Sequence, residues 1–171
     1  MRPAQALAER GGLVPFFHPA ARFGKVTDIT ADFLRTHGIR ALVLDVDNTL
    51  TTHNNPDPDK AVLSWIGDMK KQGIGLILLS NNSVKRVRPF AEGLGLDFTA
   101  WACKPLTFGL YRAAKRLGLS PKNIAMVGDQ IFTDIIAGNL LGCMSIFVTP
   151  MEPEAGPFFR LKRKIERMIL K

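Results

Sequence analysis

The chain has 171 residues, 46% of them hydrophobic, and a formal net charge of +8, which suits one globular domain with a sizeable core. No apolar run reaches the roughly 18–20 residues that a membrane-spanning helix needs. The first residues lack the apolar segment of a secretory signal, and two isolated cysteines form neither a disulfide framework nor a zinc site. We therefore expect a cytoplasmic protein whose positive charge favours anionic partners without choosing among them.

Residues 1–40 form a lead-in segment, in which a short helix is predicted from Thr30 to His37. The core, residues 41–149, then alternates strands with helices. Strands are predicted at 41–46, 75–79, 98–102, 124–127 and 144–148, and helices at about 57–72, 83–95, 106–117 and 133–141. The strands are apolar throughout instead of alternating, which favours a parallel sheet covered on both faces. The strand–helix alternation predicts a Rossmann-like, doubly wound α/β fold with right-handed crossovers.

Residues 156–171 are predicted to form a basic amphipathic helix. Its apolar face carries Phe158, Leu161, Ile165, Met168 and Ile169, and its cations include Lys162, Arg163, Lys164 and Arg167. Two interpretations stay open. The helix can pack on the domain with a solvated basic face, or it can lie on an anionic membrane surface. In either case we expect residues 1–171 to form a single domain.

Polar side chains follow four of the predicted strands. Asp45 and Asp47 end the first, Ser80 ends the second, Lys104 follows the third, and Asp129 and Asp134 follow the fourth. In an extended chain Asp45 and Asp47 point the same way, so their carboxylates need a cation or a shared proton. Because ligand sites in open α/β sheets gather beyond the carboxyl ends of the strands, these side chains predict one site.

The order Asp-x-Asp-x-Thr, Ser, Lys-Pro, Gly-Asp-x4-Asp resembles the four motifs of the haloacid-dehalogenase-like (HAD) phosphatases, over about residues 40–149. The segments at 45–50, 79–82 and 128–134 resemble more narrowly the YqeG-type group of subclass IIIA, which is related to phosphatidylglycerophosphate phosphatases. The resemblance implies the strand order 3-2-1-4-5, with the strand at 41–46 in the centre. The gaps after Asp47 and after Ser80 are too short for a cap domain. An open, capless site of this kind favours a large substrate, or one presented by a surface.

The resemblance also implies a role for each polar residue. Asp45 would be the nucleophile that forms an aspartyl-phosphate, and Asp47 the general acid and base. Mg²⁺ would be held by the Asp45 carboxylate, the Asp47 backbone carbonyl and Asp129. Asp134 would hold a metal-bound water or brace Lys104. The substrate phosphate would be bound by Ser80, the backbone of Asn81 and Lys104.

The sequence thus predicts a Mg²⁺-dependent phosphomonoester hydrolase, with phosphatidylglycerophosphate at the inner membrane surface as the expected substrate. A phosphatase of phosphoproteins or of soluble metabolites on the same fold is the first alternative. A receiver-type signalling domain shares several of these residue types, but it places its phosphorylated aspartate on a later strand. A basic nucleic-acid-binding protein is disfavoured, because no zinc finger or aromatic RNA-binding signature is present, and no nucleic-acid partner is expected.

Overall fold

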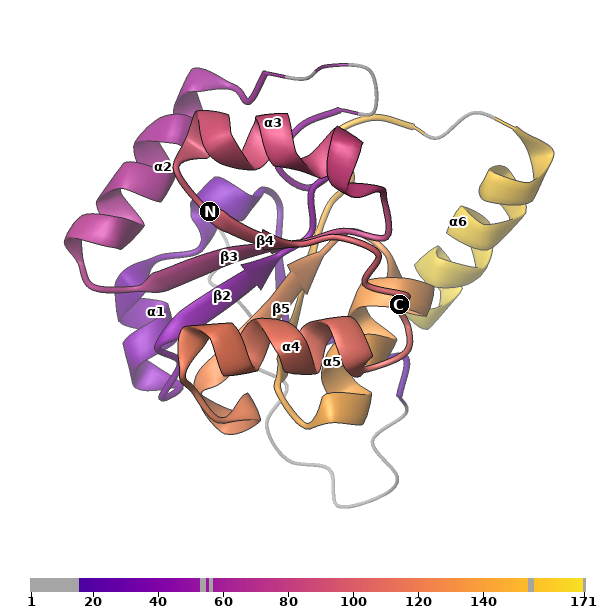
Figure 1. Cartoon of the computed structure of the whole chain (residues 1–171). Helices are drawn as coiled ribbons and strands as arrows, with labels where there is room; N and C mark the ends of the chain where they lie inside the picture. Colours follow the sequence, from indigo (N-terminus) through magenta and orange to yellow (C-terminus); the bar gives the residue numbers. More distant parts are fainter. Residues whose placement is uncertain (1–15, 53–54, 56, 154–155, 171) are drawn as a thin grey trace.

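The computed structural model describes residues 16–52, 55, 57–153 and 156–170, apart from the side chains of 157–160 (Figure 1). Strands and helices alternate along most of this length. The strands are β1 (Ala21–Phe23), β2 (Ala41–Leu44), β3 (Gly75–Leu79), β4 (Asp97–Thr99), β5 (Ile124–Gly128) and β6 (Met144–Val148). The α-helices are α1 (Ala31–Thr36), α2 (Lys60–Lys71), α3 (Val84–Leu94), α4 (Phe108–Leu117), α5 (Ile136–Leu141) and α6 (Pro157–Ile169). Short helical turns are η1 (Val26–Asp28), η2 (Pro121–Asn123) and η3 (Ile131–Ile135).

The six strands form one parallel sheet in the order β1-β6-β5-β2-β3-β4. Strand β2 lies between β3 and β5, so residues Ala41 to Leu44 pair with both neighbours. The predicted order of the five core strands and the doubly wound α/β class are confirmed. The carboxyl ends of all strands meet at one edge, which we call the carboxyl edge, and the polar residues that follow β2, β3, β4 and β5 lie there.

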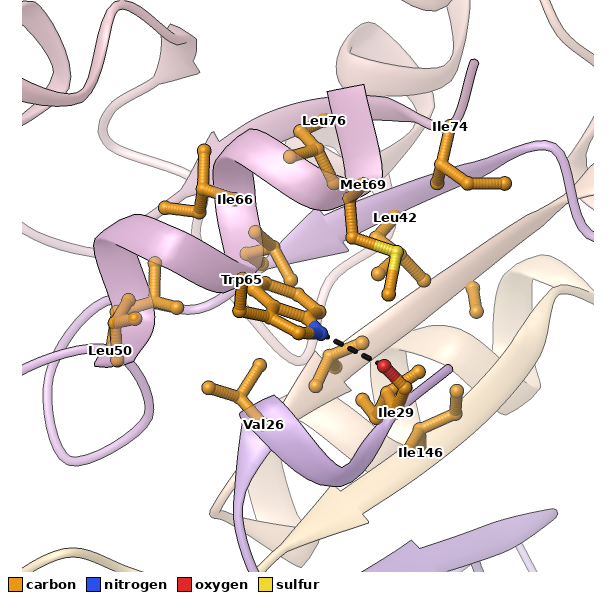
Figure 2. Packing of buried hydrophobic residues seen from close by; sticks show 14 of the residues in the cluster. Val26, Ile29, Leu42, Leu50, Trp65, Ile66, Met69, Ile74, Leu76 and Ile146 are labelled. Carbon is orange, nitrogen blue, oxygen red and sulfur yellow. Dashed lines mark hydrogen bonds between the residues drawn. The ribbon is translucent and has the colours of Figure 1, made fainter. Parts of the chain in front are cut away.

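Two hydrophobic layers hold helices against the two faces of the sheet. Leu42 and Leu44 of β2 point into one layer, which includes residues of α1, α2 and α3, and Val43 points into the other, beneath α4 and α5. Figure 2 shows the first layer around Trp65, whose indole N–H donates to the carbonyl of Ile29 at 2.8 Å. A buried indole donor therefore has a partner, and the lead-in segment is held to α2.

Several element boundaries differ from the predicted ones. Strand β1 lies in the lead-in segment and adds a sixth strand beside β6, although three residues are too short to show an apolar pattern. Helix α2 begins at Lys60 and not at Asp57, because Asp59 is the residue whose carboxylate accepts the N–H of Ala61. Helix α1 lies within the predicted range, with Thr30 accepting the N–H of Phe33.

Helix α6 stands beside the carboxyl edge (Figure 1). Ile169 and Leu170 at its end pack against a small cluster formed by Ile131, Ile135 and Phe147. The predicted apolar face of this helix does not pack as a whole, because Leu161, Ile165 and Met168 are exposed, and the side chain of Phe158 lies outside the described residues. Within the described part of the chain, no helix combines the length and the apolar character needed to cross a membrane.

Candidate active site

Three buried charges meet where β2, β4 and β5 end. The ammonium group of Lys104 forms ion pairs with Asp45, directly after β2, and with Asp134, after β5, at 2.7 Å in the second case. The same ammonium donates to the carbonyl of Leu79 at the end of β3 at 3.3 Å. All three ionic side chains are more than nine-tenths buried as residues. Side chains from three loops are therefore fixed against one another without solvent between them.

Asp129 completes a cluster of carboxylates. One oxygen from each of Asp45, Asp129 and Asp134 lies within 4.8 Å of the others, and Asp129 is fully buried. The hydroxyl of Thr49 bridges two of them, at 3.4 Å from Asp45 Oδ2 and 3.5 Å from Asp129 Oδ1. Hard oxygen donors at this spacing are the ligand type that Mg²⁺ takes in proteins. The carboxylate of Asp47, which the sequence pattern placed beside that of Asp45, is not a member of this cluster.

The electrostatics of the cluster show excess negative charge. Burial raises the pKa of Asp45 to about 7, and Asp134 adds to this effect while Lys104 opposes it. Burial, followed by the charges of Asp45 and Asp134, raises the pKa of Asp129 well above its ordinary value. Burial would lower the pKa of Lys104, but Asp134 and Asp45 outweigh it and hold that pKa above its ordinary value. A divalent cation among these carboxylates would relieve the repulsion that adds to the effect of burial on both acidic pKa values.

A single turn of π-helix returns Asp134 to the site. It runs from Ile131 to Ile135, immediately before α5, and Asp134 Oδ2 accepts the N–H of Gln130 at 3.1 Å. The predicted helix start at Thr133 is therefore wrong. Gly128 is required beneath this turn, because a Cβ there would lie 2.3 Å from the Asp134 carboxyl carbon. The Gly-Asp pair thus combines a close approach with a carboxylate of the buried cluster.

Asp47 lies on the other side of Asp45, against α3. Its carboxylate accepts from Asn82 Nδ2 at 2.6 Å and forms an ion pair with Arg86 at 2.7 Å. Strand β2 ends at Leu44, and Asn48, directly after Asp47, has a left-handed φ of 61° that starts the following turn. The charge of Asp47 still helps to raise the pKa of Asp45. Asp47 and Ser80 line a cavity of about 420 Å³, together with Arg86 and Phe90 of α3.

Ser80 and Asn81 organise the loop that carries Lys104. The side chain of Asn81 donates to the Lys104 carbonyl at 3.1 Å and accepts the Lys104 N–H at 2.8 Å, which clamps the β3 loop to the β4 loop. Ser80 is buried, and its Oγ accepts the N–H of Asn82 at 3.1 Å. The Asn81 side chain therefore positions Lys104, a contact that the sequence prediction, which assigned Asn81 a backbone role, did not include.

Arg163 of α6 reaches the cluster from outside the core. One nitrogen of its guanidinium donates to the Asp129 carbonyl at 2.6 Å, and the other forms an ion pair with Asp129 Oδ2. Glu166 binds the same guanidinium at 2.8 Å. Sequence reasoning placed Arg163 only on the basic face of a terminal helix, and it did not single out Arg86 or Asn82. The one feature of the sequence that could have indicated the contacts of Arg163 is Glu166, a lone acid among cations with an arginine one turn earlier.

Comparison with known proteins shows which family the chain resembles. The family model of the haloacid dehalogenase-like hydrolases matches residues 56–142. The probable phosphatase YqeG of Bacillus subtilis is 33% identical over 158 residues, a match that covers 92% of each chain. The chloroplastic/mitochondrial phosphatidylglycerophosphate phosphatase 1 of Arabidopsis thaliana is 26% identical over 151 residues, 82% of this chain and 43% of that one.

A solved structure shows the same fold at low sequence identity. The cobalt-bound form of deoxy-D-mannose-octulosonate 8-phosphate phosphatase from Haemophilus influenzae superimposes with a TM-score of 0.54 at 16% identity, over 78% of this chain and 88% of that one. The family match, the extent of the YqeG similarity and the doubly wound sheet agree. The chain belongs to the haloacid dehalogenase-like hydrolases.

Proposed function

We propose that this protein is a Mg²⁺-dependent phosphomonoester hydrolase that works through an aspartyl-phosphate on Asp45. The observation that carries the proposal is the buried cluster of Asp45, Asp129, Asp134 and Lys104 at the carboxyl edge. The three carboxylates are suited to hold Mg²⁺, with the Asp47 backbone carbonyl as a further oxygen donor. The ion would supply positive charge that lets an anionic carboxylate approach an anionic phosphate.

The residues divide the reaction between two steps. A carboxylate oxygen of Asp45 attacks phosphorus, the bond from phosphorus to the leaving oxygen breaks, and Asp47 gives that oxygen a proton. Water then attacks phosphorus, Asp47 takes its proton, and the bond from phosphorus to Asp45 breaks. Asp47 fits both tasks because it borders the cavity that a leaving group would enter. Ser80 and Lys104 would bind phosphoryl oxygens, where preorganised donors stabilise developing charge.

We propose phosphatidylglycerophosphate as the substrate. The similarity to a plant phosphatidylglycerophosphate phosphatase supports this choice. The lack of a cap domain in the described part of the chain supports it too. Between β2 and α2 the described residues form only a loop, and between β3 and β4 they form α3 and short loops. An open site admits a headgroup presented by a bilayer. The protein would then work in the cytoplasm and touch the anionic surface of the inner membrane from one side.

The test is a substrate panel with a matched variant. Wild-type protein and Asp45→Asn are assayed for Mg²⁺-dependent phosphate release from phosphatidylglycerophosphate, sugar phosphates, nucleotides and phosphopeptides. We expect the lipid to give the highest kcat/KM, and Asp45→Asn to be inactive on every compound. Higher turnover of a soluble metabolite or a phosphopeptide would reject the lipid assignment. Stable accumulation of phosphorylated Asp45 without release would reject the hydrolase and favour a signalling domain.

A further inference from the structure

Helix α6 exposes the side that its sequence pattern would lead one to bury. Leu161, Ile165 and Met168 follow one another at helical spacings of four and three residues, so they form one continuous stripe. Their exposed fractions are 60%, 41% and 66%. We call these three residues the α6 stripe. Lys164 lies one turn from Leu161 and from Met168, and it adds an exposed cation to the same side of the helix.

Polar contacts on the opposite side fix this orientation. Glu166 is only 2% exposed, and one of its carboxylate oxygens accepts the N–H of Ile131 at 2.9 Å. Arg163, one turn earlier, holds the carbonyl and the carboxylate of Asp129. Turning α6 to bury its stripe would break these contacts and leave the Ile131 N–H and Asp129 without their partners. Unsatisfied buried groups of this kind are costly, so the stripe stays outward.

A second apolar group lies on the other flank of the site. Trp101, Leu106 and Phe108 are each more than half exposed. They surround Lys104 in sequence, the first two on the loop from β4 to α4 and Phe108 at the start of α4. Met151 follows β6 and is also exposed, and its N–H donates to the carbonyl of Asn48 in the turn after Asp47. These residues all follow strand ends, so they lie along the carboxyl edge, as α6 does (Figure 1).

We propose that the carboxyl edge is a docking face for an anionic lipid bilayer, with the α6 stripe and the Trp101–Phe108 loop inserted on either side of the active site. The surrounding charge selects this occupant. Lys164 on α6 is exposed on the side of the stripe, and Arg112 on α4 is exposed and lines a cavity with Trp101. Apolar groups ringed by cations match a surface of acyl chains beneath negative headgroups. A second copy of the chain would bring the same cations into opposition.

This inference deepens the proposed function, because the cavity lined by Asp47 and Ser80 would open toward the headgroups that carry the substrate. It does not depend on the identity of that substrate. Contact with the bilayer is a property of the surface residues, whereas hydrolysis is a property of the buried cluster. The two can therefore be measured separately.

The experiment is co-sedimentation with phosphatidylcholine vesicles, with and without phosphatidylglycerol, at low and high salt. Wild-type protein is compared with Leu161→Ser/Ile165→Ser/Met168→Ser and with Trp101→Ser/Leu106→Ser/Phe108→Ser. Leu140→Ser is the control, because Leu140 is half exposed near the end of α5 that lies away from the carboxyl edge. Circular dichroism and hydrolysis of a soluble phosphomonoester, p-nitrophenyl phosphate, show that each variant is folded and that the α6 variant retains its chemistry.

We expect wild-type protein and Leu140→Ser to bind the anionic vesicles in a salt-sensitive way. Each triple variant should bind at least about tenfold more weakly, because it loses apolar insertion. Equal binding to neutral and anionic vesicles, undiminished binding of both triple variants, or a dimer whose formation requires the α6 stripe would overturn the proposal. Vesicle binding without hydrolysis of phosphatidylglycerophosphate would reject the substrate and leave the docking face standing.

Discussion

Two aspartates leave the end of the same strand and enter different surroundings. Asp45 is buried between Lys104, Asp134 and Asp129, three ionic groups that follow β4 and β5. Asp47 borders an open cavity, and its partner Arg86 has a side chain that is 50% exposed. A group that binds a phosphoryl oxygen or a metal gains from being fixed before the substrate arrives. A group that moves protons to a leaving group must meet substrate and water, which the cavity allows.

Removal of the cation beside Asp45 or of the cation beside Asp47 tests this contrast most directly. Lys104→Met leaves the buried carboxylates of Asp45 and Asp134 without their counter-ion, so we expect a loss of about 3–5 kcal/mol in unfolding free energy. We also expect a fall in kcat of roughly 10²–10³-fold. Arg86→Met, at a half-exposed pair, should change stability by less than about 1 kcal/mol. Urea unfolding of both variants checks the order, and equal losses would contradict the contrast.

A methyl group beneath the π-helical turn should disturb the buried carboxylate cluster and leave the surroundings of Asp47 unchanged. In Gly128→Ala the new Cβ would clash with the Asp134 carboxylate, so we expect a loss of about 1–3 kcal/mol and a weaker response to Mg²⁺. Gly93→Ala is the control, since a Cβ at that position in α3 meets nothing within 4 Å. It should stabilise the protein by roughly 0.5–1 kcal/mol. Thermal unfolding with and without Mg²⁺ separates the two, and a silent Gly128→Ala would refute the packing argument.

Substitution of Arg163 tests whether α6 supports the buried carboxylate cluster. Because its guanidinium orients the carboxylate of Asp129, one of the proposed Mg²⁺ ligands, Arg163→Gln should weaken Mg²⁺ binding by about 10–100-fold. Titration calorimetry measures this without any turnover. Arg163→Lys keeps the charge but cannot contact the carbonyl and the carboxylate of Asp129 through two nitrogens at once. It should therefore restore only part of the Mg²⁺ affinity that Arg163→Gln loses. Arg167→Gln, at an exposed arginine one turn further along the same helix, should bind Mg²⁺ as the wild type does.

The pH dependence of stability tests the protonation of Asp45 in the buried cluster. The pKa of Asp45 is raised from 3.8 to about 7, so the folded, metal-free protein holds a proton that the unfolded chain has already released. Stability from this group is full below about 4 and falls as the pH rises toward 7. Mg²⁺ prefers the ionised carboxylate, so its stabilising effect should grow over the same range. Melting temperatures with and without Mg²⁺ between these pH values test it. A Mg²⁺ effect that shrinks as the pH rises would contradict the shift.

The sequence pattern predicted the core of the sheet because four of its strands carry long apolar runs that end in polar residues. The positions of Asp45, Lys104, Asp129 and Asp134 followed from that pattern and from the family resemblance, and the structure brings these four residues together. Their catalytic roles stay predictions. Asp47 lies outside the carboxylate cluster and contacts Asn82 and Arg86, although its charge helps to raise the pKa of Asp45. Local periodicity carries no information on these contacts.

Contacts between distant segments lay beyond the pattern. Arg163 pairs with Asp129 across 34 positions, and β1 is too short to produce a recognisable period. The interpretation in which α6 packs on the domain did not predict its orientation, because that interpretation assigned the apolar face to the interior. A helix that lies on a membrane surface needs an outward apolar face, which is the orientation observed, and the membrane contact itself stays a prediction. Here Arg163 and Glu166 satisfy buried polar groups, and this requirement outweighs the burial of three apolar side chains.

The contact between Arg163 of α6 and Asp129 has a consequence for the order in which the site forms during translation. Arg163 leaves the ribosome after all six strands of the described sheet, so the nascent chain can form its parallel core while Asp129 still lacks its contact with α6. A nascent chain without α6 would thus be compact yet poor at capturing the proposed Mg²⁺ ion, and the proposed activity would arrive only when α6 docks.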